Sequence, residues 1–173
     1  MTSITRGIDH IGITVPDMEE ATKFFRNAFG AELAYNNLKP SDPPQEGPKA
    51  EKILGLTPGS KAVHIRLLVI GQSATIELFQ FENTNQRKRL NAYDYGLQHV
   101  AFYVDDMVQA AERFSKSGGT LHTTPQDLTG NYEAGNDHQF VYGRTPWGML
   151  IELISYPKGM NYPKESEAKR WTP

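Results

Sequence analysis

Two histidines stand at the same place in two similar segments of the chain. His10 is the fourth residue of the segment 7–15, and His99 is the fourth residue of the segment 96–104. Both segments alternate in the way that is typical of a β-strand, and an acidic residue followed by Met begins two residues after each segment ends. An internal repeat of this kind indicates two equivalent modules, so the two histidines hold equivalent positions.

Two glutamates complete the set, because Glu77 and Glu152 each stand between Ile and Leu in an apolar strand pattern. Burying a carboxylate is costly unless a positive charge compensates it. A divalent cation does so, and imidazole nitrogen with carboxylate oxygen suits Fe, Co, Ni, Mn or Zn. We therefore predict that His10, Glu77, His99 and Glu152 bind one divalent metal ion and leave coordination positions open for water or substrate. For any one of the four residues taken alone, an ordinary hydrogen-bonded or solvated role is the alternative.

The elements that must position these residues follow the order β-α-β-β-β in each half. Asp17, with Glu20 three places later, is typical of a helix N-terminus, and Gly30 is typical of a helix end. In the first half we predict a strand, a helix, a short strand and a final pair joined by Gly71-Gln72, at 7–15, 17–30, 32–36, 63–70 and 74–81.

The second half repeats this order with shorter connections. We predict a strand, a helix that starts at Asp106 and stops at Gly118-Gly119, a short strand and two final strands, at 96–104, 106–118, 120–123, 138–144 and 148–156. The polar segment 124–137 reads as a loop, and an ordered loop of that length often serves a site as a lid.

Four parts of the chain follow from these elements. They are a first module at 1–81 with a Pro-rich insertion at 38–61, a polar linker at 82–95, a second module at 96–156 and a tail at 157–173. Within the insertion we expect one helical turn around 50–54. Strand alternation places the two His and two Glu on the faces that the helices leave free. A pseudo-twofold axis would then bring them together in a curved, mixed sheet cup with the helices outside, which is an α+β fold.

Composition limits the classes of function. The 173 residues form one domain or two halves that share a core, and the absence of Cys excludes disulfides and thiolate ligands. A formal net charge of −2 gives no reason to expect nucleic acid. No apolar run approaches the ~20 residues that span a membrane, and the first residues do not form the apolar core of a signal peptide. We expect a cytoplasmic protein that acts on a small molecule.

Five further side chains are candidates for binding the substrate. His64 and Arg66 alternate with apolar neighbours, so we predict that they face the site and receive a substrate anion, with a solvated sheet edge as the alternative. Phe79, Tyr103 and Tyr142 would form aromatic walls, with ordinary core packing as the alternative.

The two modules with His10, Glu77, His99 and Glu152 resemble the vicinal oxygen chelate superfamily over about residues 7–156. That superfamily includes glyoxalase I, methylmalonyl-CoA epimerase, extradiol dioxygenases, fosfomycin-resistance enzymes and bleomycin-binding proteins. The resemblance implies a glyoxalase-like fold, one divalent ion and a homodimer. It also implies a metal-dependent isomerase, epimerase or lyase, closest to the glyoxalase I and methylmalonyl-CoA epimerase branch.

The chemistry that this branch implies is proton abstraction next to a carbonyl group, with the metal as Lewis acid. By resemblance Glu152 is the first candidate for the base and Glu77 is the second. Two alternatives stay open. An extradiol-type dioxygenase would use His10, His99 and Glu152 for iron and leave Glu77 surplus, and a bleomycin-resistance-type protein would bind a ligand without chemistry.

Two departures from the family pattern concern the substrate. Bacterial glyoxalase I typically has an Arg and an Asn for glutathione where this chain has Thr14 and Phe81. The resemblance therefore does not extend to a glutathione substrate. It also leaves open whether the two modules pair within one chain or exchange across a dimer.

Overall fold

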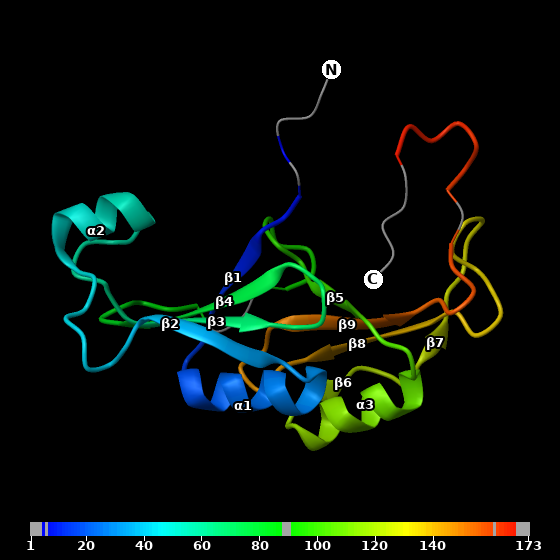
Figure 1. The fold of residues 1–173 in the computed structure, drawn as a ribbon, viewed down its shortest axis with the longest axis horizontal. Coiled ribbons are helices and arrows are strands. Elements are labelled where there is room, and N and C mark those ends of the chain that lie inside the picture. The colour runs from blue at the N-terminus through cyan, green and yellow to red at the C-terminus, as the bar shows by residue number, and fades with distance from the viewer. Residues whose placement is uncertain (1–4, 6, 88–90, 161, 169–173) are drawn as a thin grey trace. The chain divides into compact units, whose positions relative to one another are not determined.

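The structure is a computed structural model that describes residues 5, 7–87, 91–160 and 162–168 (Figure 1). The chain divides into two compact units, Met1–Gln86 and Arg87–Pro173. Residues 1–4, 6, 88–90, 161 and 169–173 lie outside the described residues, and they include parts of the predicted linker and tail. Each unit is taken by itself below.

The first unit is a four-stranded mixed sheet with two helices. Its elements are β1 (His10–Thr14), α1 (Met18–Phe29), β2 (Glu32–Leu38), α2 (Gly47–Leu54), β3 (Lys61–Val69) and β4 (Thr75–Glu82). The strand order is β1-β4-β3-β2, with β1 parallel to β4 and the other pairs antiparallel. The predicted hairpin of β3 and β4 is confirmed.

The second unit repeats this plan. Its elements are β5 (Val100–Tyr103), α3 (Met107–Lys116), β6 (Thr120–Leu121), β7 (Gln126–Asp127), β8 (Gln139–Arg144) and β9 (Leu150–Ser155). The strand order is β5-β9-β8-β6, with β5 parallel to β9, and β7 pairs with β8. Both units therefore contain the predicted β-α-β-β-β module, and the α+β, glyoxalase-like fold class is confirmed.

The first helix of each unit begins and packs in the same way. The carboxylates of Asp17 and Asp106 cap α1 and α3 by accepting hydrogen bonds from the backbone N–H groups three residues on, at 2.8 and 2.9 Å. Phe24 and Phe25 of α1 and Phe114 of α3 are fully buried. Burying a Phe side chain contributes roughly 1.5–3 kcal/mol, so these rings fix each helix on one face of its sheet.

Two short elements differ from the prediction. The insertion at 38–61 contains α2, an eight-residue helix, where one turn was expected. Pro48 stands in its first turn, where the missing N–H of proline costs no hydrogen bond, and no residue of α2 is buried. The predicted loop 124–137 contains β7, a two-residue strand that pairs with Gln139 and Phe140. A strand this short shows no alternation that a sequence pattern could reveal.

Alternation on the strands separates two faces in each sheet. Ile76 and Leu78 of β4 are buried on the face that α1 covers, whereas Glu77 points to the opposite face. In β9, Ile151 and Leu153 are buried beneath α3, with Glu152 on the other face. Each unit therefore presents its glutamate on the face that its own first helix leaves free. None of the helices in the described part of the chain is long and apolar enough to cross a membrane.

Candidate metal centre

The first unit brings His10 and Glu77 together. The parallel pairing of β1 with β4 sets Gly12 beside Glu77, so the side chains of His10 and Glu77 lie on the same face. The Nε2 atom of His10 lies 3.4 Å from Oε2 of Glu77. The His10 side chain is 45% exposed and that of Glu77 is 19% exposed, so the pair lies at an accessible surface of its unit.

The second unit brings His99 and Glu152 together in the same way. His99 directly precedes β5, and the parallel pairing of β5 with β9 sets Ala101 beside Glu152. The Nε2 atom of His99 lies 3.0 Å from Oε2 of Glu152. This pair is less exposed than the first, at 26% and 11%.

Each imidazole is oriented by the residue before it. Nδ1 of His10 lies 2.7 Å from Oδ1 of Asp9, and Nδ1 of His99 lies 2.8 Å from Oε1 of Gln98. Both partners offer an acceptor oxygen to Nδ1, so a proton on Nδ1 would leave Nε2 of each ring free to bind a metal. The hydrogen bond to Asp9, and then the charge of Glu77, raise the pKa of His10 against the opposing effect of desolvation.

The two pairs have the geometry of metal ligands. Nitrogen and oxygen ligands about 2.1 Å from an ion, at adjacent octahedral positions, lie about 3 Å apart. The Nε2–Oε2 distance of 3.0 Å in the second pair matches this edge, and the distance of 3.4 Å in the first pair is longer. In the described residues no cluster of three or more His, Asp or Glu side chains forms a complete site. The observed arrangement is one His–Glu pair in each unit, and the donor atoms of both pairs are of the kinds that suit a divalent ion.

Glu152 has a second polar neighbour in Tyr142. The two residues are directly opposite each other on β8 and β9, so their side chains lie side by side on one face of the sheet. Burial raises the pKa of Glu152, and the positive field of His99 and the Tyr142 hydrogen bond oppose this shift. Burial and then the Glu152 charge also raise the pKa of Tyr142.

The predicted aromatic walls lie on the same faces as the glutamates. Phe79 lies two residues after Glu77 on β4 and stacks on Phe81, with ring centres 5.8 Å apart and planes at 5°. These rings pack against a buried apolar cluster of Leu38, Ala62 and Ile65. In the second unit Tyr103 packs edge-on against Tyr156 at 4.7 Å. Their contact with a substrate stays a prediction.

His64 and Arg66 lie on the other face of the first sheet, which corrects their predicted orientation. Arg66 is opposite Leu78 on β4, so it shares the face that α1 covers, whereas Leu67 shares the face of Glu77. Both His64 and Arg66 are buried. Sequence alternation establishes that neighbouring residues point to opposite faces, but the register of β3 against β4 decides which face each takes.

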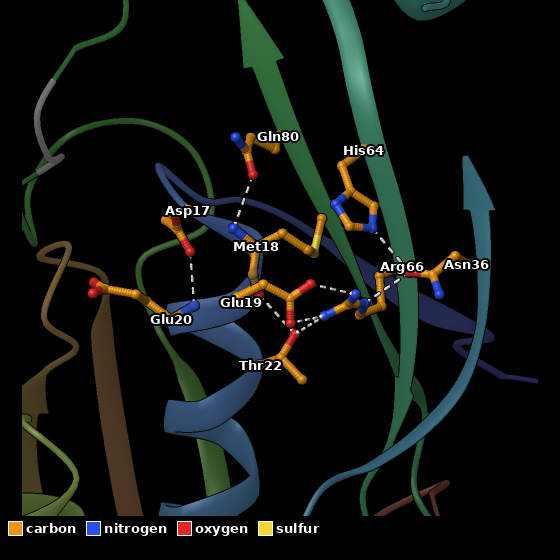
Figure 2. A network of polar contacts seen from close by, with 9 residues as sticks. All are labelled: Asp17, Met18, Glu19, Glu20, Thr22, Asn36, His64, Arg66 and Gln80. Atoms are coloured by element: carbon orange, nitrogen blue, oxygen red, sulfur yellow. Dashed lines mark hydrogen bonds and ion pairs between the residues drawn. The ribbon is translucent and has the colours of Figure 1, made fainter. Parts of the chain in front are cut away.

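A polar network between α1 and the sheet engages these two residues (Figure 2). Arg66 donates two hydrogen bonds to the Glu19 carboxylate, at 2.7 and 3.0 Å, and one to the Thr22 hydroxyl at 2.8 Å. Asn36 Oδ1 lies 2.8 Å from Nε of Arg66 and 2.9 Å from Nε2 of His64. The guanidinium is thereby committed to α1 and β2, and we no longer assign it to a substrate anion.

Sequence reasoning missed the side chains that orient the site. Asp9 and Gln98 hold the imidazoles, and Tyr142 was assigned to a wall without its contact to Glu152. A signal for the first two exists in the repeat, because both histidines follow a residue with a side-chain oxygen acceptor. The contact of Tyr142 depends on the pairing of β8 with β9 and has no such signal.

Comparison with known proteins shows which family the chain resembles. The family model described as Glyoxalase/Bleomycin resistance protein/Dioxygenase superfamily matches residues 7–153. The 2-epi-5-epi-valiolone epimerase of an Actinomyces species is 32% identical over 168 residues, which are 96% of this chain and 88% of that protein. The ethylmalonyl-CoA/methylmalonyl-CoA epimerase of Cereibacter sphaeroides is 27% identical over 147 residues, which are 84% of this chain and 95% of that protein.

A solved structure agrees with the fold. The glyoxalase family protein from Bacillus cereus superposes with a TM-score of 0.67 at 22% identity, covering 88% of this chain and 95% of that one. The two curated relatives confirm the prediction of an enzyme of the isomerase or epimerase kind. With its repeated modules and the match over nearly the whole repeat, the chain belongs to the glyoxalase/bleomycin resistance protein/dioxygenase superfamily.

Proposed function

We propose that this protein is a metal-dependent epimerase that inverts a carbon next to a carbonyl group in a small oxygenated substrate. The observation that carries the proposal is the pair of matching His–Glu contacts, one in each unit, with Nε2–Oε2 distances of 3.4 and 3.0 Å. In the proposed centre His10, Glu77, His99 and Glu152 together hold one divalent ion, either within a chain or across two chains. Both curated relatives are named as epimerases, which supports this reaction type.

The position of Glu77 favours four ligands over three. A dioxygenase-like site of His10, His99 and Glu152 would leave Glu77 without a role. Instead Glu77 contacts His10 as Glu152 contacts His99, and it lies on the same face of its sheet as its histidine. This equivalence supports the isomerase-type ligand set over the dioxygenase alternative.

The proposed roles of the residues follow from their surroundings. A divalent ion held by the four side chains would stabilise the negative charge that develops on a substrate oxygen. Glu152 would remove the proton from one face of the carbon next to the carbonyl group, and a proton exchanged with solvent would reach the opposite face, so that the configuration inverts. Glu152 is the first candidate for this base because it is the less exposed of the two glutamates, and Glu77 is the second.

The names of the two related epimerases indicate which substrates to test first. We expect 2-epi-5-epi-valiolone to be the first substrate class because its epimerase is the more similar of the two relatives and matches more of this chain. Methylmalonyl-CoA is the second. The assay incubates each compound with the metal-loaded protein in D2O and follows both the new epimer and deuterium at the inverted carbon by NMR.

Glu152→Gln is the variant that tests the assignment of the base. We expect epimer formation and deuterium uptake to fall by at least about 100-fold, because general acid–base catalysis contributes roughly 10²–10⁴-fold. Glu165→Gln, which replaces an exposed carboxylate of the same unit, is the control. Turnover of Glu152→Gln at the wild-type rate would reject the assignment, and no deuterium uptake by the wild-type protein with either compound would reject these substrates.

A further inference from the structure

The two His–Glu pairs are equivalent in the repeat, but their cross-strand neighbours differ. Glu77 is directly opposite Leu67 on β3, whereas Glu152 is directly opposite Tyr142 on β8. Side chains directly opposite each other in an antiparallel pair have Cβ atoms about 4.5–5.5 Å apart and interact. The hydrocarbon side chain of Leu67 has no hydrogen-bond donor, and the phenol of Tyr142 has one. The repeat therefore supplies a donor to one glutamate and an apolar contact to the other.

The ring of Tyr142 is held by contacts on two sides. It packs edge-on against the imidazole of His99, with ring centres 5.2 Å apart and planes at 81°. It packs edge-on against Phe140 as well, at 5.8 Å and 76°. Because the ring packs against His99 and the residue lies directly opposite Glu152 on the neighbouring strand, Tyr142 is next to both members of the second pair. A ring restrained in this way fixes the position of its hydroxyl group.

We propose that Tyr142 is a positioning residue that holds the Glu152 carboxylate in the orientation required for proton transfer. This role rests on the proposed function and goes beyond it, because it gives the two glutamates different tasks. The carboxylate of Glu152 is restrained by His99 and Tyr142, and so presents one defined orientation to the substrate. Glu77 has Leu67 in the corresponding place and serves as a ligand.

The test is Tyr142→Phe, which removes the hydroxyl group and keeps the ring that contacts His99 and Phe140. Removing a side chain that orients a metal ligand typically costs 10–100-fold in affinity or activity. We expect kcat to fall about 10-fold or more with little change in KM, because the ring still forms the wall and the geometry of the base is lost. Tyr93→Phe, which makes the same chemical change at an exposed tyrosine of the linker, should match the wild type.

A second readout does not depend on turnover. The protein loaded with Co²⁺ in place of its own ion has visible absorption bands that report the ligand geometry. We expect these bands to shift in Tyr142→Phe and to stay unchanged in Tyr93→Phe. The two variants should have the same free energy of unfolding in urea, so that a shift reports ligand geometry and not a loss of folding.

These experiments test the positioning role of Tyr142 separately from the proposed epimerase function. Wild-type turnover with an unchanged kcat and unchanged cobalt bands in Tyr142→Phe overturns the positioning role and leaves the proposed function intact. A rise in KM alone assigns Tyr142 to the substrate wall and likewise overturns the positioning role. A wild-type protein that neither binds a divalent ion nor turns over substrate overturns both.

Discussion

At the residue scale, the candidate site consists of two similar pairs, each a histidine next to a glutamate. In each pair the Nδ1 atom of the histidine contacts a side-chain oxygen of the preceding residue. The equivalence of the two histidines and of the two glutamates was predictable from the repeat, and His10 contacts Glu77 as His99 contacts Glu152. Their role as metal ligands stays a prediction. The orientation of Arg66 was not predictable. Its alternation with apolar neighbours is compatible with either face, and the strand register, which the sequence does not specify, places it beneath α1.

Asp9 provides a prediction at this scale. Asp9→Ala removes the acceptor of the His10 Nδ1 proton, so the ring loses both its fixed tautomer and part of its basicity. We expect the affinity for a divalent ion to fall about 10-fold, at the low end of the range for such partners, because Asp9 is itself exposed to solvent. Competition against a chromophoric chelator measures the affinity.

The control for Asp9→Ala is Asp105→Ala, which removes an exposed carboxylate that follows the corresponding strand of the second unit. Its affinity for the ion should equal that of the wild type. Equal affinities for all three proteins would mean that the Asp9 contact has no part in holding the imidazole.

At the element scale, each unit is built so that one sheet face packs against a helix and the other stays available for the ligand pair. The helices, the main strands and their order were predictable from alternation and caps, such as Asp17 before α1. The helix α2 and the strand β7 were harder to predict because neither buries a side chain that would impose a pattern. Besides apolar packing, the contacts of Arg66 with Glu19 and Thr22 join α1 to its sheet.

Glu19→Gln tests this contact. The substitution removes the charge that pairs with the buried guanidinium of Arg66 and leaves a weaker acceptor. We expect the free energy of unfolding in urea to fall by about 1–2 kcal/mol, a value kept small because the Glu19 side chain is 73% exposed.

Glu20→Gln is the matched control for Glu19→Gln. Glu20 is the next residue on α1, and its side chain points away from Arg66 (Figure 2). Its substitution should change stability by less than about 0.5 kcal/mol. If the two variants were equally stable, the Glu19–Arg66 pair would contribute nothing to the docking of α1.

The same network predicts how stability depends on pH. Burial, and then the charge of Arg66, lower the pKa of His64 below 6.5, and the hydrogen bond from Arg66 lowers the pKa of Glu19 below 4.5. Both groups bind protons more readily in the unfolded chain, so folding loses stability as pH falls. The loss from His64 begins below about pH 6.5, and the loss from Glu19 begins below about pH 4.5 and continues through its folded pKa.

Urea unfolding between pH 7 and pH 3.5 measures this dependence. His64→Gln should flatten the curve in the upper part of the range, and Glu19→Gln should flatten it in the lower part. An unchanged slope in both variants would assign the acid sensitivity to other groups.

At the scale of the whole molecule, the repeat produces two units that each carry one His–Glu pair. Family membership and module order followed from the sequence, because a repeat of β-α-β-β-β with matched His and Glu positions is a long-range pattern. The different surroundings of the two glutamates did not follow, since they depend on which side chain lies across the strand.

Elemental metal analysis of the purified protein tests that central claim most directly, in the wild type and in His10→Ala, Glu77→Ala, His99→Ala and Glu152→Ala. We predict about one divalent ion per chain in the wild type and a large loss in every variant, since each unit supplies two of the ligands. Loss of the ion in the variants of one unit, with full occupancy in those of the other, would contradict a shared centre. Wild-type protein free of metal even after divalent ions are added back would contradict it as well.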